Sequence, residues 1–304
     1  MPDKPAAEIR IDAELVRDLL QEQAPQLAGA ADEGLRHVAD GWDCAVWRLG
    51  DDLAVRLPRR AVAAPLILHE QQVLPGIARR LAPAGLGVPV PLVTGRPARR
   101  YPWAWSIVPW FAGDTGLVVP RVRRIGWAAP LARAVRLLHT PAAPGFPPNP
   151  VRGVALRTRA AAVHARVDAL KGQVAADALA RLALIWDAAL RAPAWSDGPV
   201  WIHGDLHPGN LVARGGRLVA MIDFGDVTAG DPAYDLSVAW MAFDRDGRTA
   251  FRAELSDRYD EATWTRAKGW AAAVALMLLG QSDNDPPYAE LGAEAVAELV
   301  AAED

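Results

Sequence analysis

Residues 201–226 read WIHGDLHPGNLVARGGRLVAMIDFGD and contain the strongest functional pattern in the chain. Asp205 and Asn210 form an H-x-D-x-x-x-x-N motif, and Asp223 begins an Asp-Phe-Gly triplet. Phosphoryl transfer needs a carboxylate that orients a hydroxyl nucleophile, together with an amide and a second carboxylate that hold magnesium on a nucleotide. The pattern therefore predicts that the chain phosphorylates a hydroxyl group, with Asp205 as the base and with Asn210 and Asp223 as magnesium ligands.

The spacing of these polar residues has a structural reason. Residues 211–213 and 218–222 have strand-like patterns, and the two glycines at 215–216 suit a tight turn because glycine adopts positive φ without strain. In this hairpin we expect Asn210 to lie opposite Met221, with Asp223 as a diagonal neighbour whose backbone is roughly 7–8 Å away. Two oxygen-bearing side chains at that separation can share one magnesium ion.

Other functional classes have weaker support in the sequence. His203 and His207 flank Asp205 at a spacing that is also found at zinc sites, but Pro208 and the nearby glycines argue against the helix on which such a pair usually sits. We expect His203 to brace the loop instead. The sequence contains neither G-x-S-x-G nor G-x-x-x-x-G-K-[ST], which argues against a serine hydrolase and against a Walker-type nucleotide binder.

Composition narrows the class of protein further. The 304 residues carry a formal net charge of −3, which argues against a nucleic-acid binder that relies on a basic surface. Cys44 is the only cysteine, so no intrachain disulfide is possible. The first ten residues lack the apolar core of a secretory signal, and the longest apolar run, at 270–279, is too short to span a bilayer. We therefore expect a cytoplasmic protein without membrane association.

The order of the expected elements predicts two lobes. The first part of the chain has strand patterns at 35–38, 45–49, 53–57, 88–93 and 105–108, and helix patterns at 11–24 and 65–84. A hairpin turn is expected at Asp51-Asp52. Helix patterns dominate the rest, at 118–139, 155–191, 233–244, 249–257, 262–280 and 288–302, with a proline-rich loop at 140–150. This is an α+β arrangement with a small strand-rich lobe and a larger helical lobe.

The motifs resemble those of the aminoglycoside phosphotransferase family, which has the protein-kinase-like fold. HGDLHPGN at 203–210 is similar to the family's catalytic loop, IDFGD at 222–226 to its metal motif, and GDPAYDL at 230–236 to the signature that follows. The resemblance continues through GWDCAVWRLGDDLAVRLPRR, YPWAWSIVPWFAG and DEATWTRAKGW, and so covers nearly the whole chain. It implies a bilobal fold, with an antiparallel-sheet nucleotide-binding lobe at 1–108 and a mainly helical catalytic and acceptor-binding lobe at 109–304. It also implies Asp235 as a structural carboxylate that supports the catalytic loop.

The resemblance implies a phosphate-binding role for the first lobe, with ATP or GTP and Mg²⁺ as cofactors. The loop at 40–46, with Gly41 and Trp42, would cover the phosphates. Arg56 stands where kinases place a phosphate-contacting lysine, and Glu70 would pair with it. Arginine can bind phosphate bidentately and stays charged. The alternative is that Arg56 is an ordinary arginine on the surface of a strand.

The connection between the lobes is implied to read the nucleotide base. Pro109 has no N–H, so only its carbonyl can contact the adenine amino group. The Phe111 N–H would then donate to the ring. Cys44, within the loop over the phosphates, is expected to be a small filler rather than a nucleophile.

The acceptor is harder to predict. Aminoglycosides are polycations, and the acidic C-terminal part of the chain fits such a substrate; Asp226, Asp283 and Asp285 are the candidate binding residues. The glutamates at 290, 294 and 298 recur every four residues and are expected to be the solvated face of the last helix. A kinase of an aminoglycoside-type antibiotic is therefore the leading hypothesis.

Two alternatives stay open. One is a kinase with the same mechanism that acts on a metabolic sugar or amino alcohol, or on another antibiotic such as a macrolide. The other is a nucleotide-binding pseudokinase, for which Arg56 in place of lysine is the best support.

Overall fold

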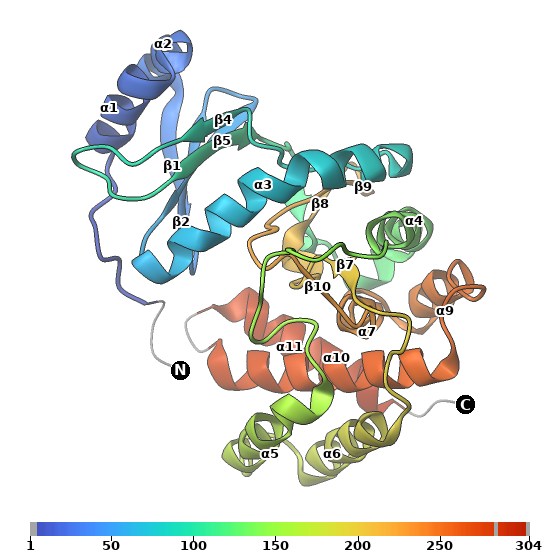
Figure 1. The fold of residues 1–304 in the computed structure, drawn as a ribbon. Helices are drawn as coiled ribbons and strands as arrows, with labels where there is room; N and C mark the ends of the chain where they lie inside the picture. Colours follow the sequence, from blue (N-terminus) through green and yellow to red (C-terminus); the bar gives the residue numbers. More distant parts are fainter. Residues whose placement is uncertain (1–4, 283–284, 302–304) are drawn as a thin grey trace.

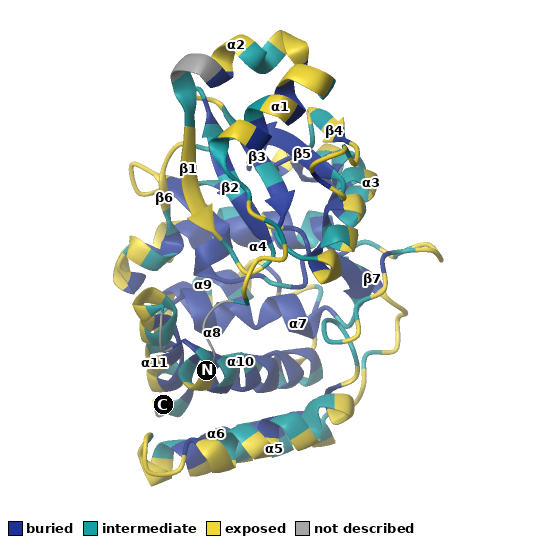
Figure 2. Ribbon diagram, turned by 90° about the vertical axis from the view of Figure 1, so that its left-hand side faces the viewer, coloured by how far each residue is buried: buried dark blue, intermediate teal, exposed yellow. Residues whose placement is uncertain are grey.

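A five-stranded antiparallel sheet in the order β1-β2-β3-β5-β4 forms the N-terminal lobe (Figure 1). The computed structural model describes residues 5–282 and 285–301. The strands are β1 Leu35–Asp40, β2 Cys44–Leu49, β3 Leu53–Pro58, β4 Val93–Gly95 and β5 Trp105–Pro109. The hairpin expected at Asp51-Asp52 joins β2 to β3 through a three-residue turn, in which Gly50 adopts a φ of 61°. Strand β1 is the exposed outer strand of this sheet (Figure 2).

The prediction of a strand at 88–93 is wrong. The structure has irregular chain there, and β4 begins only at Val93. Pro89 and Pro91 explain the difference, because proline has no backbone N–H to donate to a sheet ladder. The preceding Gly87 forms a parallel bridge with Ala220, so this part of the chain pairs with a strand of the other lobe.

Three helices belong to the first part of the chain: α1 Ala13–Gln23, α2 Pro25–Gly34 and α3 Ala64–Leu81. Pro25 separates α1 from α2 and occupies the first turn of α2, where its missing N–H costs nothing. The apolar face of α1, with Leu15, Leu19 and Leu20, packs into the core of the N-terminal lobe. The last part of α3, from Leu74 onward, packs instead into the core of the C-terminal lobe, so α3 connects the two lobes.

The C-terminal lobe is mainly helical. Its helices are α4 Ala128–Leu138, α5 Ala160–Ala169, α6 Ala176–Arg191, α7 Ala233–Leu236, α8 Val238–Ala242, α9 Arg245–Ala253, α10 Glu261–Gln281 and α11 Pro286–Val300. Helix α10 lies at the centre, is buried along most of its length and packs against α11 and α6 (Figure 2). No helix in the described part of the chain has the length and apolarity needed to cross a membrane.

Three of the expected long helices are divided. Three short 3₁₀ turns, at Gly116–Val118, Arg121–Arg123 and Ile125–Trp127, precede α4. The helix expected at 155–191 breaks between α5 and α6, where Gly172 adopts a left-handed φ of 82°. The helix expected at 233–244 divides at Ser237 into α7 and α8. The proline-rich segment 140–150 is a loop, as predicted.

Two small sheets carry the motif loops. One joins β6 Asp114–Thr115, β8 Leu211–Arg214 and β9 Arg217–Met221; the other pairs β7 Val200–Ile202 with β10 Thr228–Gly230. The predicted Gly215-Gly216 turn is confirmed, with φ values of 57° and 77°. The predicted register is wrong by one residue, because the pairing shifts between Val212 and Ala213. Leu211 therefore lies opposite Met221.

Candidate active site

Asp235 fixes the loop that follows β7. Its buried carboxylate accepts hydrogen bonds from the backbone N–H of His203, at 2.7 Å, and of Gly204, at 3.0 Å. His139 Nε2 lies 3.1 Å from the same carboxylate, and His139 Nδ1 contacts the hydroxyl of Tyr259. A carboxylate with several such partners is held in one orientation, so the start of the loop is fixed as well. This is the supporting contact that the resemblance implied for Asp235.

The two motif loops lie in direct contact at Gly204. This glycine has a φ of 80°, and a Cβ atom added to it would lie 2.2 Å from the backbone oxygen of Asp226. Both the left-handed backbone and the lack of space require glycine. The loop that carries Asp205 and the loop that carries Asp223 are thereby packed backbone to backbone.

His203 braces the same two loops, as predicted. Its Nδ1 accepts a hydrogen bond from the backbone N–H of Asp205, and its Nε2 lies 3.0 Å from the carbonyl oxygen of Ile222. Since Nδ1 accepts, Nε2 carries the proton and donates to this carbonyl. The ring also packs against Phe224, with 4.3 Å between the ring centroids.

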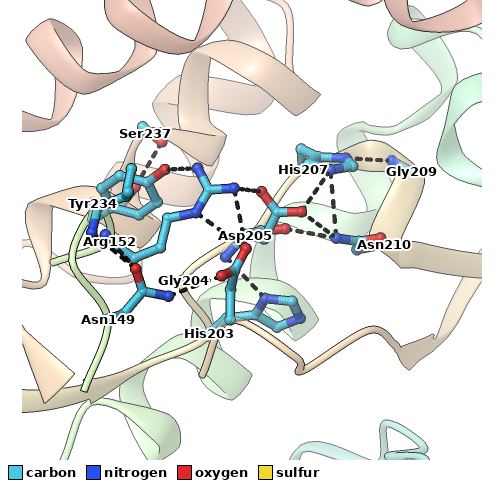
Figure 3. Close-up of polar contacts among 12 residues, drawn as sticks. Asn149, Arg152, His203, Gly204, Asp205, His207, Gly209, Asn210, Tyr234 and Ser237 are labelled. Carbon is cyan, nitrogen blue, oxygen red and sulfur yellow. Dashed lines mark hydrogen bonds and ion pairs between the residues drawn. The ribbon is translucent and has the colours of Figure 1, made fainter. Parts of the chain in front are cut away.

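Asp205 lies among three polar side chains (Figure 3). Its Oδ1 is 3.1 Å from Arg152 Nη2, and its Oδ2 is 3.3 Å from His207 Nε2 and 3.2 Å from Asn210 Nδ2. Burial by itself raises the pKa of Asp205, but the contacts with His207 and Arg152 outweigh it and hold the pKa well below its usual range. The carboxylate is therefore ionised and fixed in direction.

The sequence analysis missed Arg152. It comes from the irregular segment before α5, and its Nη2 lies 3.1 Å from both Asp205 and Asp226. Its Nη1 donates to the hydroxyl of Tyr234 (Figure 3). Asn149 completes the group by donating to Asp226 Oδ1 at 2.8 Å. No local pattern marks this arginine, because its partners lie more than 50 residues further along the chain.

Asn210 and Asp223 offer the oxygen atoms that suit a magnesium ion. The amide nitrogen of Asn210 is held by the backbone oxygen of Asp205 at 2.7 Å, which leaves the amide oxygen as the atom able to bind a cation. Backbone pairing continues here, since the Ile222 N–H donates to the Asn210 carbonyl. Asp223 has a φ of 59° and is the single non-glycine residue with positive φ in the described ranges. An amide oxygen and a carboxylate fit the preference of Mg²⁺ for oxygen ligands.

Arg56 and Glu70 form the ion pair that the resemblance implied. Arg56 Nη1 lies 2.6 Å and 2.7 Å from the two carboxylate oxygens of Glu70. Arg56 Nη2 also reaches Asp223 Oδ1, at 2.9 Å. Burial lowers the pKa of Arg56, but Glu70 and Asp223 raise it by more, so the guanidinium stays charged. Arg56 is thus no surface arginine: it points into the space between the lobes.

One cavity of about 480 Å³ brings most of the predicted residues together. Its lining includes Gly41, Trp42, Cys44, Arg56, Glu70, Asp205, Asn210, Asp223, Asp226 and Asp285, and it includes Arg152, which was not predicted. Cys44 is buried, and burial raises the pKa of its thiol far above the usual value. This fits the predicted role of a filler. Asp283 lies outside the described residues.

Pro109 and Phe111 are not among the residues that line this cavity. Pro109 is the last residue of β5 and lies opposite Leu53. The ring of Phe111 lies over Gly87, where an added Cβ would be 2.3 Å from it. The cavity therefore covers the predicted phosphate and acceptor region, and the proposed base contacts of these two residues stay a prediction.

The expectation for the last helix needs correction. Glu294 lies 3.1 Å from Arg121, and Glu298 lies 2.9 Å from Arg248, so both form ion pairs with the rest of the lobe. Only Glu290 is exposed to solvent in the way predicted. Helix α11 is thus fixed to the C-terminal lobe by charge as well as by its apolar face.

Comparisons with known proteins concern the family and the fold of this chain. The model of the phosphotransferase enzyme family matches residues 34–270. The fold is similar to the GDP and kanamycin complex of APH(2")-IIia, with 16% identity, a TM-score of 0.67, and coverage of 94% of this chain and 98% of that chain. It is also similar to the GDP complex of wild-type aminoglycoside 2'-phosphotransferase-IIIa, with 18% identity, a TM-score of 0.67, and coverage of 95% and 98%.

A third solved structure is named for a different substrate. Macrolide 2'-phosphotransferase MphH from Brachybacterium faecium has 20% identity, a TM-score of 0.62, and coverage of 96% of this chain and 99% of that chain. No curated protein matches the sequence significantly. At these identities the solved structures establish a shared kinase-like fold.

Proposed function

We propose that this chain, which belongs to the phosphotransferase enzyme family and is a small-molecule kinase, transfers the γ-phosphoryl group of ATP or GTP to a hydroxyl group of its substrate. One observation carries the proposal: Asp205, Asn210 and Asp223 line the same cavity as the Arg56–Glu70 ion pair. This set combines a fixed carboxylate, two oxygen ligands and one cation, which are the groups that phosphoryl transfer requires.

Asp205 is the proposed base. Its carboxylate accepts a hydrogen bond from the acceptor hydroxyl and takes up the proton as the new oxygen–phosphorus bond forms. The bond between the γ-phosphorus and the bridging oxygen breaks, and the nucleoside diphosphate leaves with the electron pair of that bond. Because Arg152 and His207 hold the carboxylate in place, the acceptor oxygen is directed along one line toward the phosphorus.

Arg56 is proposed to contact the phosphates from β3. Glu70 holds it bidentately from α3, which is anchored in the larger lobe, and this positions the guanidinium above the cavity. Asn210 and Asp223 are the proposed ligands of Mg²⁺, which when bound neutralises charge on the β- and γ-phosphates. The loop with Gly41 and Trp42 is proposed to cover the phosphates. A cytoplasmic location, where ATP is available, is part of the proposal.

The aminoglycoside hypothesis has mixed support. Of its three candidate residues, Asp226 and Asp285 both line the cavity, but Asp226 is already bound by Arg152 and Asn149. The acceptor is therefore proposed here only as a small hydroxyl compound.

The test is nucleotide-dependent phosphorylation by the full chain. ADP or GDP release is measured with Mg²⁺ and a mixed panel of hydroxyl compounds, for the wild type and for Asp205→Asn. We expect the variant to lose at least a hundredfold in turnover while it still binds nucleotide in a calorimetric titration. The exposed Asp197→Asn is the matched control. Unchanged turnover in Asp205→Asn contradicts the proposal. Nucleotide binding by the wild type without turnover of any compound in the panel favours a sensor.

A further inference from the structure

The cavity has an apolar wall beyond Asp205. Helix α10 contributes Val274, Met277, Leu278 and Gln281, whose spacing places them on one face of the helix. Ser282 and Asp285 follow, at the turn into α11. Of the four side chains on α10 only Gln281 is polar, so this part of the lining is mainly hydrocarbon.

Tyr288 of α11 continues this wall next to the catalytic loop. Its ring packs edge-on against His207, with 5.5 Å between the ring centroids. Its hydroxyl lies so close to Gly209 that a Cβ added to this glycine would be 2.7 Å from it. Burial raises the pKa of the Tyr288 hydroxyl, so the group is a neutral donor. An acceptor bound beside Asp205 therefore meets an aromatic ring and aliphatic side chains.

Most of the carboxylates around the cavity contact an arginine of this chain. Arg152 contacts Asp205 and Asp226. In the loop at 40–46, Asp43 lies 3.2 Å from Arg60. Glu70 and Asp223 both contact Arg56. Three arginines thus contact at least five of the acidic side chains in the described lining. A substrate with several amines must compete with these arginines for each carboxylate.

We propose that the acceptor is a hydroxyl compound with an extended apolar face rather than a polyamine, and that Arg152 sets this preference by occupying Asp205 and Asp226. The inference rests on the proposed function, because it assigns the acceptor of that same site. The apolar face packs on Val274, Met277 and Tyr288, and Gln281 and Ser282 supply hydrogen bonds to its polar edge. Burying apolar surface provides the binding free energy.

The test is binding and turnover with probes of three kinds. Kanamycin is a polyamine, ribose is polar and uncharged, and menthol and erythromycin have large apolar faces with hydroxyl groups. Each is titrated calorimetrically into the full chain with Mg²⁺ and a nonhydrolysable nucleotide, and each is then assayed for phosphorylation. We expect at least one apolar probe to bind at least tenfold more tightly than kanamycin and ribose. Equal or tighter binding of kanamycin overturns the inference, as does the failure of both apolar probes to bind.

Variants of the wall make the test specific. Met277→Glu places a carboxylate on the acceptor side, so we expect at least tenfold weaker binding of the apolar probe and stronger binding of kanamycin. Val274→Thr keeps the shape of the side chain, and it should weaken binding of the apolar probe only severalfold. Leu184→Glu introduces the same charge at an exposed position on α6 and should change neither. If Met277→Glu behaves like Leu184→Glu, α10 is not the acceptor wall and the inference fails.

The two proposals fail in different ways. Loss of turnover in Asp205→Asn together with a preference for kanamycin leaves the phosphotransferase assignment intact and removes the apolar acceptor. Binding of an apolar probe without phosphorylation leaves the apolar wall intact and removes the assigned reaction. The calorimetric titration needs no turnover, so each proposal is judged by its own measurement.

Discussion

Arg56 Nη2 lies 2.9 Å from Asp223 Oδ1, so the cation of β3 directly contacts the carboxylate of the metal motif. The same guanidinium holds Glu70 through Nη1. Two carboxylates, one from α3 and one from the loop after β9, therefore meet at the guanidinium that β3 supplies. Lysine offers a single ammonium group at the end of its chain, which cannot reproduce this forked contact.

The first prediction concerns Arg56→Lys. We expect kcat/KM to fall about tenfold, a loss of about 1.4 kcal/mol in transition-state stabilisation, while the free energy of unfolding changes little. Arg56→Ala should lose at least a hundredfold and should also destabilise the fold by about 3–5 kcal/mol, because Glu70 is left buried without its cation. Steady-state kinetics and urea unfolding measure the two quantities. A lysine variant as active as the wild type contradicts a role for the forked contact.

The motif residues could be predicted from sequence because their geometry is local. Asp205 and Asn210 lie in one loop, and Asp223 lies just beyond a hairpin whose Gly-Gly turn is visible in the sequence. The one-residue error in register came from a bulge between Val212 and Ala213, which no residue type signals. The backbone of Asp223, with its φ of 59°, was equally invisible, since aspartate adopts this region only where its surroundings impose it.

Contacts between distant segments could not be predicted. Arg152 lies in an irregular stretch that no periodicity describes, and it reaches Asp205 only because the chain returns across α5, α6 and β7. The charges of α11 gave a misleading pattern for a related reason. Glu294 and Glu298 have the spacing of a solvated face, yet Arg121 and Arg248 cover that face. Periodicity shows which residues share a face and is silent about what packs on it.

The second prediction concerns Arg152 and the pH dependence of turnover. Because the pKa of Asp205 is lowered in the folded protein, its carboxylate stays ionised as the pH falls. Protonation of Asp205 should therefore cause no decline in turnover above about pH 4. Arg152→Gln removes one cause of the lowering, so the pKa of Asp205 rises. Its kcat should then decline with falling pH at a higher pH than in the wild type.

The control for Arg152→Gln is Arg157→Gln, which removes an exposed arginine from the same segment. Its pH profile should coincide with that of the wild type. A merely structural role for Arg152 predicts lower turnover at every pH with an unchanged profile, and that outcome contradicts the positioning role.

The third prediction concerns Asp235→Asn. The asparagine amide keeps one oxygen acceptor but presents N–H groups where the second oxygen accepts, so a backbone N–H of His203 or Gly204 loses its partner. A buried unsatisfied N–H costs about 1–3 kcal/mol, and we expect a loss of this size in urea unfolding. Turnover should fall as well, because the loop with Asp205 is released. A thermally stable variant with wild-type turnover shows that the loop is held by other contacts.

The last prediction compares two glycines that share a backbone conformation. Gly204 and Gly198 have φ values of 80° and 81°, but a Cβ at Gly204 meets the backbone of Asp226 at 2.2 Å, whereas a Cβ at Gly198 meets nothing within 4 Å. Gly198→Ala should therefore cost only the left-handed penalty, about 1–2 kcal/mol, with turnover unchanged. Gly204→Ala adds a backbone clash that separates the two motif loops, so it should cost more and abolish turnover. Equal effects of the two substitutions, measured by urea unfolding and by ADP release, contradict the claim that contact between these loops assembles the site.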